Sequence, residues 1–211
     1  MSKNRSIETM PLDGGCVCFD FVNTIHSRVE EDSYDYINTY DDLIEWMEKV
    51  RLLPSEKLKT LKKQVNTNKK GAQKAVDEIK NKRELLYNFF SPVIHSRAPE
   101  KSIIDRFNQS LSDSLSALAI HNDKGDLILG WDNSKVNFYE PLKYIFKNAF
   151  DIITTIPQNR FKECGSCGWL FIDKSKNNSR TWCSMKTCGS IEKAKRYYYR
   201  KKDEVKNRSL N

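Results

Sequence analysis

The carboxy-terminal part of the chain carries four cysteines whose spacing is typical of a metal site. Two lie two residues apart, the other two lie four residues apart, and fifteen residues separate the pairs: Cys164, Cys167, Cys183 and Cys188. Thiolates at this spacing are donors that Zn²⁺ prefers in tetrahedral structural sites. Because four cysteines complete the coordination shell and leave no position for water or substrate, we predict one structural Zn²⁺ and no catalytic metal.

The residues around the cysteine pairs suit a small fold centred on a metal. Fifteen residues are enough for a hairpin that returns the chain to the metal, and Gly165 and Gly168 permit a tight turn. Trp169 and Trp182 are among the apolar residues expected to form a small core there. Because so short a region buries little apolar surface, zinc would supply much of its folding free energy. We predict a zinc-ribbon-like domain over residues 158–211 that ends in a basic helix.

Positive charge is concentrated in this same part of the chain. Residues 160–202 contain twelve Lys or Arg and three acidic residues, a net charge of +9, whereas the whole chain carries +8. Such a patch indicates a polyanionic partner, because Lys and Arg neutralise phosphates and release counterions. We predict that nucleic acid contacts nine of these cations: Lys174, Lys176, Arg180, Lys186, Lys193, Lys195, Arg196, Arg200 and Lys201.

The segment after the last cysteine predicts a helix with positive charge on most of its circumference. Ile191, Ala194 and Tyr198 recur at helical spacing, so we expect them to pack on the zinc core. Tyr197 and Tyr199 interleave the cations and could stack on bases or pack on sugars. The alternative interpretation is a solvated basic helix without a nucleic-acid partner.

The remaining residues predict a mostly helical domain over residues 1–157. Thr39 or Asp41 is expected to cap its first long helix and Pro54 to end it. Residues 118–131 place apolar flanks around a polar turn with a glycine, which predicts a β-hairpin. The fold class is therefore mostly α, with some β structure. Apolar residues recur at helical spacing in segments 38–54, 55–65, 74–96, 101–118 and 139–155, with a polar break at 66–73.

Four residues of this domain could line a small-molecule pocket. Asp20, Asn23 and Thr24 offer polar groups, and Trp131 with nearby phenylalanines could supply aromatic walls. Ligand sites commonly combine an apolar lining with a few such polar groups. The alternative is that Asn23 or Thr24 caps a helix that follows while the phenylalanines fill the core.

The sequence shows no constellation of catalytic residues. Cys16 and Cys18 form a C-x-C pair, which we interpret as strand or turn residues, with redox or metal chemistry as the alternative. The three histidines, His26, His95 and His121, are scattered, and no phosphate-binding glycine loop is present. We therefore expect no enzymatic activity.

Residues 163–202 resemble the CGNR-type zinc finger. That family combines a C-x2-C knuckle, an aromatic-apolar-Asp-x-Ser stretch, Arg-x-Trp-Cys-Ser-Met, and Cys-Gly-Asn-Arg before a basic helix. Here "FIDKS", "RTWCSM" and "CGSI" occupy these places, so Ser190 and Ile191 replace the usual Asn-Arg. If that arginine touches phosphate or base, this chain lacks the contact. The resemblance implies the four cysteines as ligands and, as motif positions, Asp173, Ser175, Arg180, Trp182, Ser184 and Met185.

The amino-terminal part is similar to the ABATE domain, which usually precedes this finger. The stretches that carry the resemblance are "GGCVCFDFVNT", "YDDLIEWMEKVRLL", "LLYNFF" and the last helix before the finger. The resemblance implies transcription regulation linked to stress responses. DNA binding in that family is inferred from the positive charge of the finger.

Taken together, these features predict a zinc-finger protein that binds nucleic acid, with DNA favoured over RNA, and regulates transcription. The helical domain would sense a small-molecule effector or mediate self-association as a homodimer. An RNA- or ribosome-associated protein and an enzyme with a pocket in the helical domain are the alternatives. The first residues lack the apolar core of a secretory signal, and no apolar run is long enough to cross a bilayer. We therefore expect a cytoplasmic protein without a membrane partner.

Overall fold

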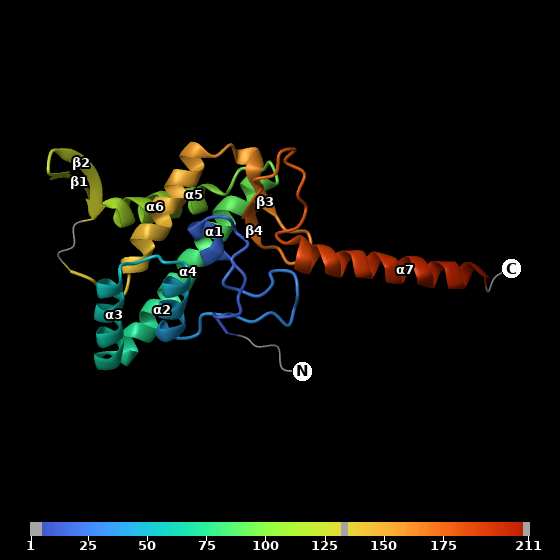
Figure 1. The fold of residues 1–211 in the computed structure, drawn as a ribbon, viewed down its shortest axis with the longest axis horizontal. Helices are drawn as coiled ribbons and strands as arrows, with labels where there is room; N and C mark the ends of the chain where they lie inside the picture. The colour runs from blue at the N-terminus through green and yellow to red at the C-terminus, as the bar shows by residue number, and fades with distance from the viewer. Residues whose placement is uncertain (1–5, 132–134, 209–211) are drawn as a thin grey trace.

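The structure, a computed structural model, describes residues 6–131 and 135–208 (Figure 1). It is mostly α-helical with two small antiparallel hairpins, as the sequence predicts. No helix in this described part of the chain is both long and apolar enough to span a membrane. The elements in order are α1 (Val17–Val22), α2 (Tyr40–Lys49), α3 (Ser55–Thr67), α4 (Lys69–Ile94), α5 (Lys101–Leu115), β1 (Leu118–Asp123), β2 (Asp126–Trp131), α6 (Glu140–Thr155), β3 (Phe161–Glu163), β4 (Leu170–Ile172) and α7 (Ser190–Arg208).

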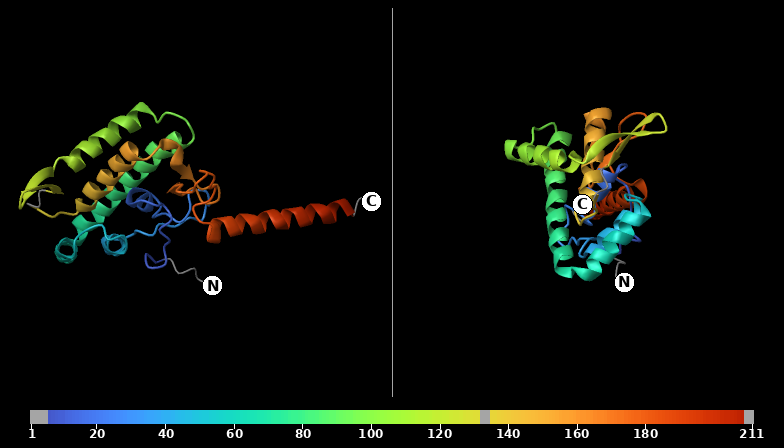
Figure 2. Two further views of the ribbon diagram at one scale, coloured as in Figure 1. Left: turned by 45° about the horizontal axis from the view of Figure 1, so that its top comes forward. Right: turned by 90° about the vertical axis from the view of Figure 1, so that its left-hand side faces the viewer.

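Long helices form the body of the molecule, with one hairpin and one helix at its ends. α5 packs against both α4 and α6, and α1 lies against α4 and α6 (Figure 2). α2 and α3 pack on each other and on α4. Figure 1 shows the β1–β2 hairpin at one end of this body and α7 extending away from the opposite end.

The capping prediction for α2 is confirmed. The Thr39 hydroxyl accepts a hydrogen bond from the Asp42 N–H at 3.2 Å, and the Asp42 carboxylate accepts one from the Thr39 N–H at 2.8 Å. This reciprocal pair satisfies two N–H groups that the helix itself leaves unpaired. The helix ends at Lys49, earlier than the expected stop at Pro54, because Arg51 takes a left-handed conformation with φ +52°.

The polar break predicted at residues 66–73 is much shorter in the structure. Asn68 alone separates α3 from α4, and its side chain accepts a hydrogen bond from the Gly71 N–H at 2.9 Å. Asparagine is a preferred capping residue, so a single cap is enough to start a new helix. The polar residues that follow lie on the exposed face of the first turns of α4.

The interpretation of Cys16 and Cys18 as strand or turn residues is wrong for Cys18, which is buried within α1. Cys16 caps this helix, with its sulfur accepting a hydrogen bond from the Phe19 N–H at 3.4 Å. Asn23 lies at the carboxyl end of α1, so it does not cap a following helix as the alternative interpretation expected. The phenylalanines of α1 do fill the core, as that interpretation also expected.

The predicted β1–β2 hairpin is confirmed. Its strands pair in the register Leu118↔Trp131 to Asp123↔Asp126. The turn between them uses positive φ at Lys124 (+52°) and Gly125 (+100°), which suits the right-handed twist of two-residue hairpins. Its apolar side chains lie largely in solvent, away from the core, and include Ile120, Leu127, Ile128 and Leu129.

One hydrophobic core runs through the helical body and the second hairpin. The Phe19 ring of α1 packs edge-on against Phe90 of α4 at 5.0 Å and against Phe161 of β3 at 5.7 Å between ring centroids. Leu170 and Phe171 of β4 are fully buried in the same cluster. The division of the chain at residue 157 stays a prediction, and the two sides of that boundary share their core.

Candidate metal centre and nucleic-acid interface

The four predicted cysteine ligands converge on one point. Their sulfur atoms all lie within 4.8 Å of one another. The Sγ atoms of Cys167 and Cys183 are 3.7 Å apart, as are those of Cys183 and Cys188. Four thiolates around Zn²⁺ with bonds of about 2.3 Å form a tetrahedron with edges of about 3.8 Å. The donor set and its spacing therefore fit one structural zinc ion.

The thiols also influence each other's ionisation. Hydrogen bonds from the Cys167 and Cys183 thiols lower the pKa of Cys164. The same contacts with Cys164 raise the pKa of Cys167 and Cys183. A bound dication stabilises all four thiolates, so zinc binding at this site releases protons and strengthens as the pH rises.

The first cysteine pair lies on a tight turn between β3 and β4. The Gly168 N–H donates to the Cys164 carbonyl at 2.9 Å, and the Cys164 N–H donates to the Trp169 carbonyl at 2.8 Å. Gly168 has φ +72°, and a Cβ atom there would lie 2.9 Å from the Cβ of Arg28. Glycine is therefore required both by the backbone conformation and by the close approach of the amino-terminal segment.

A buried carboxylate organises the loop between the cysteine pairs. Asp173 is fully buried and accepts hydrogen bonds from the backbone N–H groups of Ser175 and Arg180, each at 2.8 Å. Arg160 donates to the carbonyl oxygens of Asp173 and Ser175. These contacts explain the aspartate of the Asp-x-Ser pattern and fix the path of the chain from β4 back to Cys183.

The segment that follows α1 is hydrogen-bonded to the zinc turn, which is the turn between β3 and β4 that carries Cys164 and Cys167. The Arg28 N–H donates to the Cys167 carbonyl at 2.8 Å, and the Trp169 indole N–H donates to the Ile25 carbonyl at 2.7 Å. The Asn23 side chain both accepts from the Leu170 N–H at 2.9 Å and donates to the Leu170 carbonyl at 2.8 Å. No sequence pattern predicted these contacts, because they join segments that lie far apart along the chain.

Trp131 lies apart from the other residues proposed for a ligand pocket. Asn23 and Thr24 are buried, and the Thr24 hydroxyl contacts the Phe21 carbonyl and Arg83. Asp20 accepts a hydrogen bond from the Gly14 N–H at 2.8 Å. Trp131 lies on β2, where its ring packs on Tyr144 at 5.1 Å. Asn23 and Thr24 therefore act within the fold, while Trp131 belongs to a separate part of the molecule.

Two of the nine cations predicted to contact nucleic acid donate hydrogen bonds to backbone carbonyls of the fold. The Arg180 guanidinium donates to the carbonyls of Trp182 and Cys183 and lies 4.9 Å from the Phe171 ring centroid. The Lys174 ammonium donates to the Gly15 carbonyl at 3.0 Å. The other predicted cations have exposed side chains: Lys176, Lys186, Lys193, Lys195, Arg196, Arg200 and Lys201.

The expected packing of α7 on the zinc core is wrong. Ile191 is 50% exposed and Tyr198 is 63% exposed, and Ala194 is exposed as well. The reason is the direction of the helix, whose axis leaves the body beyond its first turn (Figure 1). Its first turn is joined to the turn between β3 and β4 by Glu192, which accepts a hydrogen bond from Ser166 at 3.2 Å. Lys195 of the same helix also donates to Glu192, at 3.0 Å.

Comparison with protein families matches both parts of the chain. Residues 15–155 match the ABATE family, described as "Putative stress-induced transcription regulator", and residues 160–201 match the CGNR zinc finger. A comparison with curated proteins finds no match. The four clustered cysteines all lie within the residues that match the finger.

Proposed function

Because the chain belongs to the ABATE family and carries a CGNR zinc finger, we propose that it is a regulator that binds DNA through α7. The exposed cations of this helix carry the proposal. Five of the predicted contacts lie between its fourth and its twelfth residue, and its second residue lies three positions after the last zinc ligand. A metal-fixed start gives the helix one direction relative to the body.

The geometry of α7 suits the major groove of duplex DNA. That groove admits an α-helix, and contacts to phosphates on both walls set its position. Lys193, Arg196 and Arg200 recur at helical spacing and form one cationic stripe, while Lys195 and Lys201 lie on other faces. Because α7 projects from the body, two walls of a groove can reach these faces without contact with the other helices (Figure 2).

Neutralisation of the cationic stripe tests the proposal. We expect a Lys193→Gln, Arg196→Gln, Arg200→Gln variant to bind duplex DNA more weakly than the parent chain. The slope of log K against log salt should flatten by up to about 3, since each lost phosphate contact removes about 0.9. The matched control replaces three exposed lysines of α3 and α4 with Gln, which gives the same net charge: Lys63, Lys69 and Lys70. Equal affinity of the stripe variant and the control variant would refute binding through α7.

RNA binding is the second candidate function, and the tyrosines of α7 favour it. Tyr197, Tyr198 and Tyr199 are 56%, 63% and 61% exposed. Exposed aromatic rings next to cations can stack on unpaired bases. Competition among duplex DNA, single strands and structured RNA separates the two candidates. Preference for a single strand or RNA, lost on replacement of the tyrosines with Leu, would select the second candidate.

The substitution at the family motif offers another test at the start of α7. Ile191 stands where the finger family has arginine, and its side chain is half exposed beside Lys195 and the metal centre. We expect Ile191→Arg to strengthen DNA binding, because arginine adds a bidentate phosphate or base contact. Ile191→Gln, which also adds a polar side chain but no charge, is the control.

A further inference from the structure

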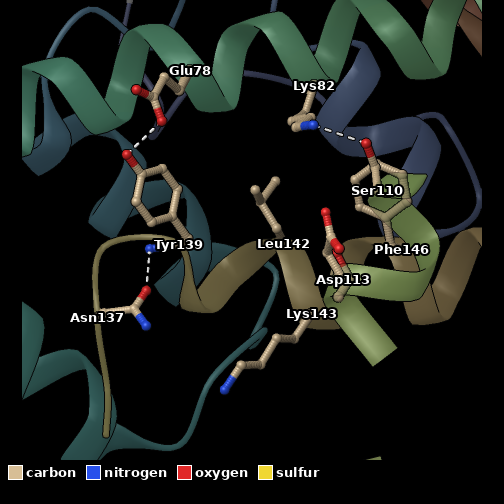
Figure 3. Close-up of a pocket in the computed structure, with 10 residues that line it drawn as sticks. Glu78, Lys82, Ser110, Asp113, Asn137, Tyr139, Leu142, Lys143 and Phe146 are labelled. Carbon is tan, nitrogen blue, oxygen red and sulfur yellow. Dashed lines mark hydrogen bonds between the residues drawn. The ribbon is translucent and has the colours of Figure 1, made fainter. Parts of the chain in front are cut away.

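A cavity of about 390 Å³ lies between α4, α5 and α6 (Figure 3), and none of the four cysteines of the metal centre lines it. Its volume falls in the range of sites that hold small organic molecules. Polar side chains reach it from α4 and α5, and the segment that leads into α6 closes one side. The fully buried Phe146 and the nearly buried Leu142 of α6 provide an apolar wall.

The Lys82 ammonium enters this cavity without a counterion. Its nitrogen donates to the Ser110 hydroxyl at 2.8 Å, and this buried serine in turn donates to the Arg106 carbonyl at 2.8 Å. Lys82 makes no ion pair with any residue that the structure describes. Since an ammonium offers three N–H groups, two remain available to an anionic oxygen.

Two carboxylates line the cavity together with Lys82. Asp113 of α5 accepts a hydrogen bond from Gln109 at 2.8 Å and makes no ion pair within the described residues. Glu78 of α4 accepts a hydrogen bond from the Tyr139 hydroxyl, which holds the tyrosine ring at the rim opposite Lys82 (Figure 3). The cavity therefore presents one available cation and one available anion beside an apolar wall.

We propose that this cavity binds a free amino acid with an apolar side chain. The ligand carboxylate pairs with Lys82, the ligand ammonium pairs with Asp113, and the side chain packs on Leu142 and Phe146. This pairing gives each charge of a zwitterion a partner of opposite charge, and the apolar side chain is removed from water when it packs on the apolar wall. The inference stands apart from nucleic-acid binding, because no residue of the cavity belongs to the finger.

The same charges disfavour phosphorylated ligands. Lys143 also lines the cavity, but its ammonium pairs with the buried Glu140 at 2.9 Å, and Figure 3 shows its side chain directed away from Lys82. A phosphate dianion would thus meet a single available cation, flanked by Glu78 and Asp113. Repulsion between the phosphate and these two carboxylates would cost binding free energy, whereas the ammonium of a zwitterion is attracted to Asp113.

Titration of the zinc-loaded full chain with L-leucine and L-phenylalanine tests the inference. Two-dimensional ¹H–¹⁵N spectra should shift at residues that line the cavity in α4, α5 and α6. Two analogues examine the charges separately: 4-methylpentanoate lacks the ammonium of leucine, and 3-methylbutylamine lacks its carboxylate. We expect each analogue to bind roughly tenfold or more weakly than leucine, because each loses one charged hydrogen-bonding group.

Variants of the two charged residues make the assignment specific. Lys82→Met should weaken leucine binding roughly tenfold or more and remove the preference for leucine over 3-methylbutylamine. Asp113→Asn should instead remove the preference over 4-methylpentanoate. Lys101→Met, at an exposed position of α5, is the matched control and should leave binding unchanged. Absence of localised shifts with both amino acids, or equal binding of leucine and both analogues, would overturn the proposal.

Discussion

At the scale of single residues, Asn23 connects two parts of the chain that lie 147 residues apart. Its buried amide pairs with both backbone groups of Leu170, next to the zinc turn. A side-chain amide is suited to this because it carries a donor and an acceptor side by side. The residue therefore replaces a missing strand neighbour for β4.

Asn23→Ala should destabilise the protein by at least about 2 kcal/mol, because it leaves a buried N–H and a buried C=O without partners. Chemical denaturation of the zinc-loaded chain measures this change. Asn66→Ala, at an exposed position of α3, is the control. A change at Asn23 within about 0.5 kcal/mol, as at ordinary surface sites, would contradict the role assigned to it.

Asp20 makes stability depend on pH. Burial raises its pKa to about 6, against the hydrogen bond from the Gly14 N–H, which lowers it. A carboxyl whose pKa is higher in the folded than in the unfolded state stabilises the fold while it is protonated. This contribution to the free energy of unfolding is lost as the pH rises through about 6. Asp20→Asn should therefore be more stable than the parent at pH 8, by up to about 3 kcal/mol, with no advantage below about pH 4.

Unfolding in urea across this pH range checks the expectation for Asp20. The difference between variant and parent is compared at each pH, because loss of zinc in acid affects both proteins alike. Asp77→Asn, which removes an exposed carboxylate of α4, is the control and should show no such trend. A constant difference between Asp20→Asn and its parent from pH 4 to pH 8 would contradict the effect of burial.

At the scale of elements, periodicity predicted the long helices and the β1–β2 hairpin because each has one buried face or a clear turn. α1 was missed as a helix, since Cys18, Phe19, Phe21 and Val22 are all buried and leave no polar face to mark the period. The stripe of Ile191, Ala194 and Tyr198 gave the opposite error. Its spacing is helical, but spacing alone does not show whether a face meets the core or solvent.

The exposure of α7 separates its contribution to binding from its contribution to stability. A chain that ends at Arg196 keeps the first turn, where Glu192 contacts Ser166, and loses Tyr197, Arg200 and the residues beyond. We expect its free energy of unfolding to change by less than about 1 kcal/mol, as for removal of exposed residues. Its affinity for nucleic acid should fall strongly.

Denaturation and binding measured on the same shortened chain decide this point. A loss of several kcal/mol in stability would show that α7 packs on the body in solution. Unchanged affinity would show that the first turn and the loop suffice for binding.

At the scale of the whole molecule, the metal centre and the helical body share one core. The site ligands were predictable, because spacing alone marks a four-cysteine zinc site. The hydrogen bonds of Asn23 and Arg28 to the zinc turn were not predictable, because they are tertiary contacts between segments that are distant in the sequence. The shared core implies that zinc stabilises the helices as well as the finger.

Removal of zinc with a chelator should therefore lower the melting temperature of the helical body by at least about 5 °C, since a few kcal/mol shift a chain of this size by that amount. Far-ultraviolet circular dichroism, which measures helix content, reports mainly on the body, because α2–α6 contain most of the helical residues. A helical transition that is unchanged after complete zinc removal would show that the finger and the body fold independently.

The metal content of purified protein tests the account most directly. Elemental analysis of material prepared under reducing, chelator-free conditions should find one zinc per chain, bound by Cys164, Cys167, Cys183 and Cys188. Cys183→Ser should hold far less than one zinc, while Cys16→Ser should retain it, since Cys16 lies outside the cluster. A parent chain without zinc, or a Cys183→Ser variant with a full equivalent, would contradict the account.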